Sequence, residues 1–178
     1  SIGQGYVLTS PLQLAVMTAR IASGTAVAPR LVRMVNDKEL PAATAPALDL
    51  PAEYLEGVRK GMYEVVNGEQ GTAKSSRIVD PTLVMAGKTG TSQVRNISKA
   101  EREAGVISND DLPWNRRDHA LFVGYAPFEA PRYAIAVVVE HGGGGSTAAA
   151  PIARDVILRA LSGGMPSLEA YPSSQRGR

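Results

Sequence analysis

A lysine, two glycines and three hydroxyl side chains stand together in the stretch MAGKTGTSQV, residues 85–94. The cation of Lys88 could lower the cost of deprotonating a nearby hydroxyl and could attract a carboxylate. Gly90 would let a substrate backbone lie against the chain without meeting a side chain. The amide of Thr91 could donate to a developing oxyanion, and the hydroxyls of Thr89 and Thr91 could bind a carboxylate. Together these groups predict one wall of a serine acyl-transfer site.

Two other interpretations of the same stretch have to be weighed. Gly87-Lys88-Thr89 resembles the end of a phosphate-binding loop, but that motif requires an earlier glycine where Thr82 stands. The preceding run TLVMAG also reads as a strand rather than as a flexible loop. The stretch could instead be an ordinary edge strand, on which a lysine guards against aggregation. Three residues alone do not separate this last interpretation from the acyl-transfer wall.

The bulk composition excludes several classes of function. With 178 residues, 44% hydrophobic and 20% charged, the chain is ordinary for one globular domain. A net charge of +2 does not argue for nucleic acid or for an anionic membrane surface. There is no cysteine, and His119 and His141 lack ligand-like spacing, so we expect no metal site. We expect both histidines to be hydrogen-bonded structural residues rather than catalytic bases.

Helix signals are strongest near the start of the chain. Thr9 or Ser10 can cap a helix that begins at Pro11, and Gly24 can end it. A second helix is predicted from about Ala52 to Val66, before Asn67-Gly68. Both helices precede the lysine-hydroxyl stretch and are expected to support it.

Three strand-like runs follow, of which the first carries the lysine and the hydroxyls. They are Leu83–Val94, Ala120–Ala126 and Tyr133–Glu140. The second and third are joined by PFEAPR, which is short enough for an antiparallel hairpin. The third is apolar on both faces, so we expect it to be central. Helices, an antiparallel meander and a closing helix predict an α+β fold, an antiparallel β-sheet flanked by helices.

The closing helix is expected over about 149–161, after the glycine-rich segment HGGGGS (141–146), which we interpret as a native turn. Its packing residues are predicted to be Ile152, Val156 and Ala160. Residues 163–178 are rich in Gly, Ser, Pro and Arg and are expected to form a flexible tail. The charged loop 95–117, with Trp114, could border the cleft or be mobile and solvated, and we take the second as the default.

Long motifs around the strand resemble those of class B penicillin-binding proteins, and within them the elongation-specific group. They are IGQGYVLTSPLQLA, GKTGTSQV and DHALFVGYAPFEAPRYAIAVVVEHGGGGSTAAAPIARDVI, in the family's order and spacing. Lys-Thr-Gly is itself a signature of that family. The resemblance implies that residues 1–162 are the C-terminal portion of a transpeptidase domain. Lys88 and Thr91 would then be catalytic, and Thr89, Gly90 and Thr91 would bind substrate.

The resemblance also implies an activity and a set of partners. The intact protein would be a serine-type D-Ala-D-Ala transpeptidase that cross-links peptidoglycan stem peptides and is acylated by β-lactams. It would work without cofactor at the periplasmic face of the bacterial inner membrane, held by an N-terminal anchor. Its partners would include the upstream part of its own domain and a polymerising glycosyltransferase of the rod-elongation complex, but no nucleic acid.

Two family motifs are missing from the sequence. No serine is followed three positions later by lysine, and no Ser-x-Asn occurs. Ser108-Asn109-Asp110 has its asparagine one position early and lies after Lys-Thr-Gly, so we expect it to be a decoy. We therefore interpret the chain as the C-terminal part of a longer protein, inactive by itself, which starts downstream of the nucleophile. The alternatives are a non-catalytic penicillin-binding-like sensor or scaffold, and a β-lactamase of related fold.

Overall fold

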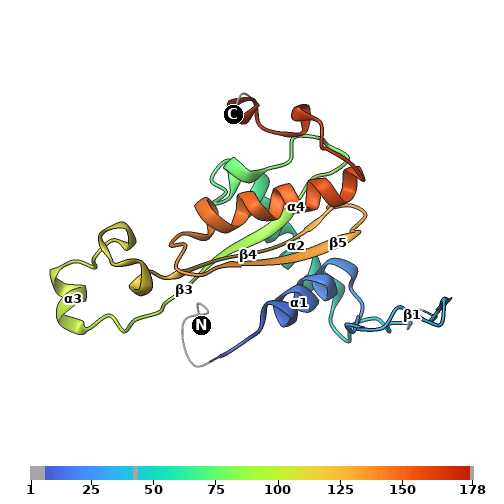
Figure 1. Ribbon diagram of the computed structural model, residues 1–178, viewed down its shortest axis with the longest axis horizontal. Helices are drawn as coiled ribbons and strands as arrows, with labels where there is room; N and C mark the ends of the chain where they lie inside the picture. The colour runs from blue at the N-terminus through green and yellow to red at the C-terminus, as the bar shows by residue number, and fades with distance from the viewer. Residues whose placement is uncertain (1–6, 42–43, 177–178) are drawn as a thin grey trace.

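The computed structural model describes residues 7–41 and 44–176. A central three-stranded sheet is flanked by helices, and a small two-stranded hairpin stands apart from it (Figure 1). The elements are α1 (Pro11–Ser23), β1 (Met34–Val35), β2 (Lys38–Glu39), α2 (Ala52–Asn67), β3 (Ala86–Ser92), α3 (Lys99–Ala104), β4 (His119–Ala126), β5 (Tyr133–Val139) and α4 (Ala150–Ser162). The antiparallel sheet with helices confirms the predicted α+β class.

The sheet has the order β3-β4-β5, and both pairings are antiparallel. The expectation that β5 is central is therefore wrong for the sheet formed by the described residues, in which β4 lies between its two neighbours. The apolar faces of β5 are only partly buried, and no strand in the described residues pairs with its outer edge. β3 likewise occupies an edge of the sheet, which leaves the outer side of the lysine-hydroxyl strand open to a ligand.

Each face of the sheet carries its own core cluster. Phe122 points to the face covered by α4, where it packs with Ile157 and Leu158. Tyr125 lies three positions on and points to the opposite face, since side chains alternate along a strand. There it packs with Ala22 of α1 and with α2, so the sheet is held between α4 on one side and α1 with α2 on the other (Figure 1).

The start of α1 follows from local hydrogen bonding. The Ser10 side chain accepts from the Gln13 amide at 3.3 Å, while the Gln13 side chain accepts from the Ser10 amide at 2.7 Å. This reciprocal capping box satisfies two donors that a helix start leaves unpaired. Gly24 ends the helix in a left-handed conformation with φ of 72°. The predicted bounds of this helix are confirmed.

The buried face of α4 differs from the predicted one. Ile152 and Val156 are 45% and 51% exposed, whereas Ala153, Ile157 and Leu158 are buried. The helix carries apolar residues on two sides, so periodicity alone cannot select the side that meets the sheet. The sheet receives the side with Ala150 and Ala153, whose small side chains let the helix approach closely.

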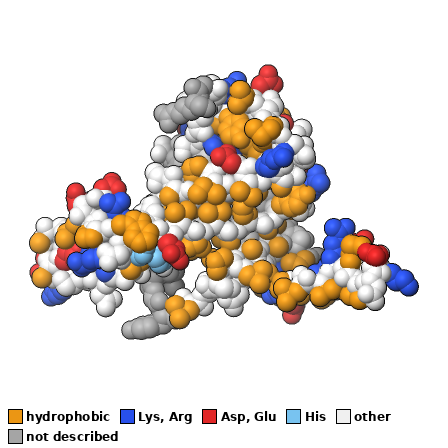
Figure 2. All heavy atoms as spheres, viewed as in Figure 1, with side chains coloured by type: hydrophobic (Ala, Val, Ile, Leu, Met, Phe, Trp, Pro, Cys, Tyr) orange, Lys and Arg blue, Asp and Glu red, His pale blue; other side chains and the backbone are white. Residues whose placement is uncertain are grey.

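Two segments project from the body and form its opposite extremities in Figure 2. One is the β1-β2 hairpin, whose turn residues Asn36 and Asp37 have φ of 49° and 60°, as two-residue hairpin turns require. The other is the lobe of residues 93–118 with α3 (Figure 1). No helix among the described residues has the length and apolar character needed to cross a membrane.

The C-terminal tail is packed rather than free in its described part. The amide of Val79 donates to the carbonyl of Ala170 at 2.8 Å, and Gln175 Nε2 donates to the carbonyl of Ser75 at 2.8 Å. The guanidinium of Arg154, only 6% exposed, also bonds the Gln175 side chain. The structure thus differs from the flexible tail expected over 163–178. That expectation rested on the composition of the tail, which does not reveal contacts with distant residues.

Candidate active site

The register of β3 sets which of its side chains share a face. Lys88 lies opposite Val123 and Gly90 opposite Leu121. Directly opposed residues of an antiparallel pair point to the same side, so Lys88 faces the side of α1 and α2. Thr89 and Thr91 belong to the α4 side. Because β3 lies at the edge of the sheet, the side chains on both of its faces lie close to solvent along its outer side.

Lys88 is exposed, and its ammonium donates to the carbonyl of Thr89 at 2.8 Å. None of the ion pairs among the described residues involves Lys88. Its charge is therefore not neutralised by a carboxylate in this part of the chain. A cation held against its own strand in this way can attract an anionic ligand to the open edge of β3.

A hollow of about 440 Å³ lies at the far end of β3, on the side of α1. The part of its lining contributed by the sheet is Gly90, Thr91, Ser92, His119, Leu121 and Val138, and the rest comes from residues at and before the start of α1. The structure thus brings Gly90 and Thr91 to this hollow, and places Lys88 and Thr89 outside its lining. Ser92 and His119 were not predicted as lining residues, and no local pattern marks them.

Thr89 instead contacts a residue that the sequence did not single out. Its Oγ1 lies 3.1 Å from Oγ1 of Thr72, in the segment after α2. The two threonines are 17 positions apart, and nothing around Thr72 resembles a catalytic motif. Only the packing of α2 against β3 brings them together.

Gly145, at the start of the turn of π-helix η4 (Gly145–Ala149) before α4, presses directly on the site strand. A Cβ atom at this position would lie 2.2 Å from the carbonyl oxygen of Leu121 and 2.6 Å from that of Gly90. Such distances are far inside van der Waals contact, so only glycine fits. At Gly90 itself a Cβ would meet Leu121 Cβ at 3.3 Å. The glycine-rich segment is therefore a native turn, as predicted, and the structure shows in addition that it packs against β3 and β4.

Both histidines make the structural contacts that we expected. The amide of His141 donates to Nδ1 of His119 at 2.9 Å, and the His141 ring bonds the carbonyl of Arg117 at 2.8 Å. The His141 ring also packs edge-on against Trp114, with centroids 4.5 Å apart. These contacts join the end of β5 to the start of β4, next to the hollow.

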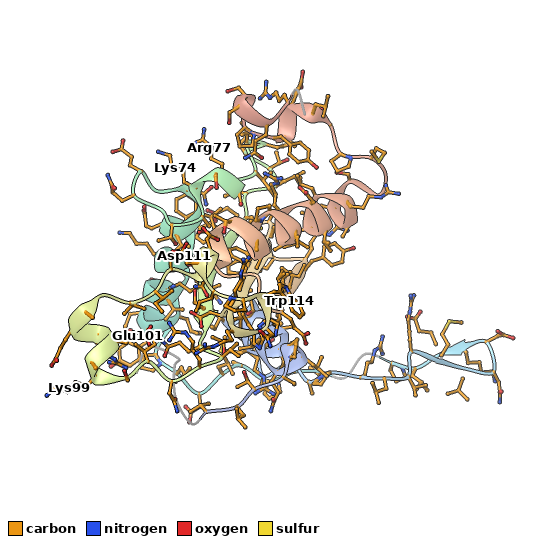
Figure 3. All side chains as sticks on the ribbon, turned by 60° about the vertical axis from the view of Figure 1, so that its left-hand side comes forward. Lys74, Arg77, Lys99, Glu101, Asp111 and Trp114 are labelled. Carbon is orange, nitrogen blue, oxygen red and sulfur yellow. The ribbon has the colours of Figure 1, made fainter. Side chains whose placement is uncertain are left out.

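The lobe of residues 93–118 is ordered by polar contacts, contrary to the default expectation of a mobile loop. Arg95 binds Glu101 through two hydrogen bonds, of 2.7 and 2.6 Å. Asn109 accepts from the Asp118 amide at 2.8 Å and donates to the Asp118 carboxylate at 3.3 Å. Asn109 is thus occupied in tying the lobe to β4, which agrees with the view of Ser108-Asn109 as a decoy. Figure 3 shows Glu101 on the lobe and Trp114 nearer the body.

Acid should loosen this lobe. The hydrogen bonds from Arg95 hold the pKa of Glu101 below its ordinary value of 4.5. A lowered pKa contributes stability that is present above the ordinary value and is lost as the pH falls through the folded value. We expect hydrogen exchange of residues 99–107 to accelerate in that acidic range.

The matched variant is Glu101→Gln, which keeps the shape of the side chain but not the charge. At neutral pH it should exchange faster than the wild type over 99–107, and the difference should shrink as the pH is lowered through the folded pKa. A constant difference at all pH values would contradict the ion pair as the cause.

Comparison with known proteins shows the family to which the chain belongs. The family model of the penicillin binding protein transpeptidase domain matches residues 1–158. The chain belongs to this family. It is similar to the peptidoglycan D,D-transpeptidase MrdA of Haemophilus influenzae, with 34% identity over 96% of the chain and 26% of the relative. With MrdA of Acinetobacter baumannii, 37% of residues are identical over 84% of the chain and 22% of the relative.

Solved structures of the family show the same fold. The crystal structure of Pseudomonas aeruginosa PBP2 in complex with WCK 5153 is 33% identical, with a TM-score of 0.68 over 96% of this chain and 34% of that one. The complex of PBP2 with MreC from Helicobacter pylori is 31% identical, with a TM-score of 0.69 over 92% of this chain and 26% of that one. The predicted membership of the penicillin-binding proteins is confirmed. The chain spans about a quarter of the length of the curated relatives it matches.

Proposed function

We propose that the chain is the C-terminal part of a peptidoglycan D,D-transpeptidase that acts through a serine acyl-enzyme. The observation that carries the proposal is the placement of Lys88-Thr89-Gly90-Thr91 on an open edge strand in a member of this family. The lysine carries a charge that no ion pair in the described residues neutralises. The other residues line, or adjoin, a hollow large enough for part of a peptide.

In the proposed reaction a serine from the upstream part of the domain attacks the carbonyl carbon between two D-alanines. The carbonyl becomes an oxyanion that accepts a hydrogen bond from the Thr91 amide. The carbon–nitrogen bond then breaks, and the terminal D-alanine leaves with a proton on its new amine. An amine of a second stem peptide attacks the acyl-enzyme, which forms the cross-linking amide and returns the serine.

In this scheme the described residues bind and stabilise but do not attack. Lys88 supplies positive potential beside the reacting hydroxyl, and the hydroxyls of Thr89 and Thr91 hold the terminal carboxylate of the donor peptide. A β-lactam carries a carboxylate and a strained amide, so it occupies the same positions and acylates the same serine. No cofactor enters any of these steps.

We further propose that the upstream part of the domain is a partner of this chain. The outer edge of the apolar strand β5 has no partner strand among the described residues, and the relatives are much longer. The location would be the periplasmic face of the inner membrane, with an anchor in the upstream part. A polymerising glycosyltransferase is the partner we expect there. The complex of the Helicobacter pylori relative with MreC makes a protein similar to MreC a further candidate.

Covalent labelling by a fluorescent penicillin on a denaturing gel tests the proposal. The chain alone is compared with the chain mixed with the upstream part of its domain. Label on the upstream piece, and only in the mixture, is the expected result. Label on this chain alone would place the nucleophile among its own serines. A folded mixture without label would favour the non-catalytic binding module, and rapid loss of label would favour a β-lactamase.

A further inference from the structure

The segment that follows α2 runs beside the site strand and is tied to the region around β3 at two points. Asn67 Nδ2, at the end of α2, donates to the carbonyl of Met85 at 2.9 Å. Farther along, the Thr72 hydroxyl meets the Thr89 hydroxyl at 3.1 Å. Lys88 lies between the two points of attachment in the sequence of the strand. The segment of residues 67–73 is therefore in position to influence the Lys-Thr-Gly motif directly.

The backbone on both sides of Thr72 is firmly held, although its side chain is exposed. A Cβ at Gly71 would lie 2.5 Å from the carbonyl oxygen of Val65 and 2.6 Å from that of Glu64, so the chain passes tightly over the last turn of α2. The amide of Ala73 donates to the Val65 carbonyl at 2.9 Å, and Ala73 is fully buried. Lys74 in the next turn is exposed (Figure 3), and its ammonium donates to the carbonyl of Glu69 at 3.3 Å. These anchors fix where the Thr72 hydroxyl stands relative to β3.

We propose that Thr72 is a positioning residue that orients the Thr89 hydroxyl toward the terminal carboxylate of the donor peptide or β-lactam. The inference rests on the function proposed above. A hydroxyl has one proton to donate and two lone pairs, and either threonine could be the donor in their contact. A carboxylate only accepts hydrogen bonds.

The direction of the contact therefore decides whether Thr89 can bind an anion. When Thr72 donates to Thr89, the proton of Thr89 remains available for the carboxylate. When Thr89 donates to Thr72, it presents only lone pairs to the ligand. An arriving carboxylate selects the first arrangement. The hydrogen bond from Thr72 to Thr89 and the hydrogen bond from Thr89 to the carboxylate then point the same way, and each strengthens the other.

Thr72→Val tests the inference, because valine keeps the shape of the side chain and removes the hydroxyl. The protein is the transpeptidase domain completed with its upstream part, and the measured quantity is the second-order rate constant of acylation by benzylpenicillin. We expect Thr72→Val to lower this constant about 5- to 10-fold, as the loss of one hydrogen bond would. The loss should fall on the dissociation constant of the initial complex rather than on the acylation step. Thr72→Ser, which keeps the hydroxyl, should stay within about twofold of the wild type.

Two further measurements distinguish positioning from a general structural role. With a penicillin methyl ester, whose carboxylate is masked, Thr72→Val should react at the wild-type rate. In a Thr89→Val background, Thr72→Val should have no additional effect, since the two hydroxyls act as one unit. An unchanged constant with benzylpenicillin, an equal loss with the ester, or an independent loss in the Thr89→Val background would overturn the inference. A wild-type domain that takes no penicillin at all would instead contradict the proposed function, and the inference with it.

Discussion

Replacing Lys88 with methionine should lower the rate of acylation by penicillin roughly 100- to 1,000-fold, the usual cost of removing a preorganised electrostatic group from an active site. Methionine keeps an unbranched side chain, shorter by one heavy atom, but removes the charge that attracts the carboxylate and favours the deprotonated hydroxyl. The rate constant is measured on the domain completed with its upstream part, by stopped-flow or gel labelling.

The folded state should tolerate this change. Lys88 is exposed, and its ammonium donates to the carbonyl of Thr89 on its own strand. The free energy of unfolding should therefore change by no more than about 0.5 kcal/mol. Lys88→Arg is the matched control, which keeps the charge and should recover part of the rate. A Lys88→Met variant that is acylated at the wild-type rate would show that the lysine only guards an edge strand.

The second large effect is expected from Gly145→Ala. The added methyl group would lie 2.2 Å from the Leu121 carbonyl oxygen, 2.6 Å from the Gly90 carbonyl oxygen and 3.0 Å from the Gly90 nitrogen. These are backbone atoms of paired strands, so the turn before α4 or the site strand itself must move. We expect a loss of roughly 1–3 kcal/mol in the free energy of unfolding, as for overpacking of a core. Acylation should fall as well, because Gly90 lines the hollow.

Gly144→Ala is the neighbouring control. A Cβ at Gly144 would meet only the hydroxyl of the exposed Thr147 side chain, at 3.0 Å. That side chain can rotate away with the loss of one exposed hydrogen bond, from its hydroxyl to the Gly144 carbonyl, so the cost should stay near or below about 1 kcal/mol. Chemical denaturation of both variants checks the difference. Equal stability of the two would show that η4 does not support the site strand.

The sequence was sufficient wherever structure depends on neighbours along the chain. The bounds of α1 follow from Ser10, Gln13 and Gly24, because caps are hydrogen bonds and backbone conformations within one turn. The antiparallel pairing of β4 with β5 follows from a short connection, and the predicted wall of the site follows from the order of Lys88, Gly90 and Thr91. These features require no knowledge of which elements meet in space.

Tertiary structure decided the features that join distant segments. Two such features are the place of β4 at the centre of the described sheet and the side of α4 that is buried. Both depend on which apolar surfaces are complementary in shape, and the periodicity of a single element does not contain that information. The packed tail depends on a hydrogen bond between Gln175 and Ser75, 100 positions apart. The Arg95–Glu101 pair likewise orders a lobe whose composition resembled a solvated loop.

The features of the candidate site can also be divided into those predicted from the sequence and those decided by the fold. Sequence alone predicted that Lys88, Thr89, Gly90 and Thr91 form an anion-binding wall, because a cation, hydroxyls and a glycine at adjacent positions suit that chemistry. Only the fold determined that Gly90 and Thr91 line a hollow beside the start of α1 and that Thr89 meets Thr72, 17 positions away. The reason is physical. A motif specifies which groups are present, whereas the hydrogen-bond partners of those groups are chosen by the packing of α2 and α4 against the sheet.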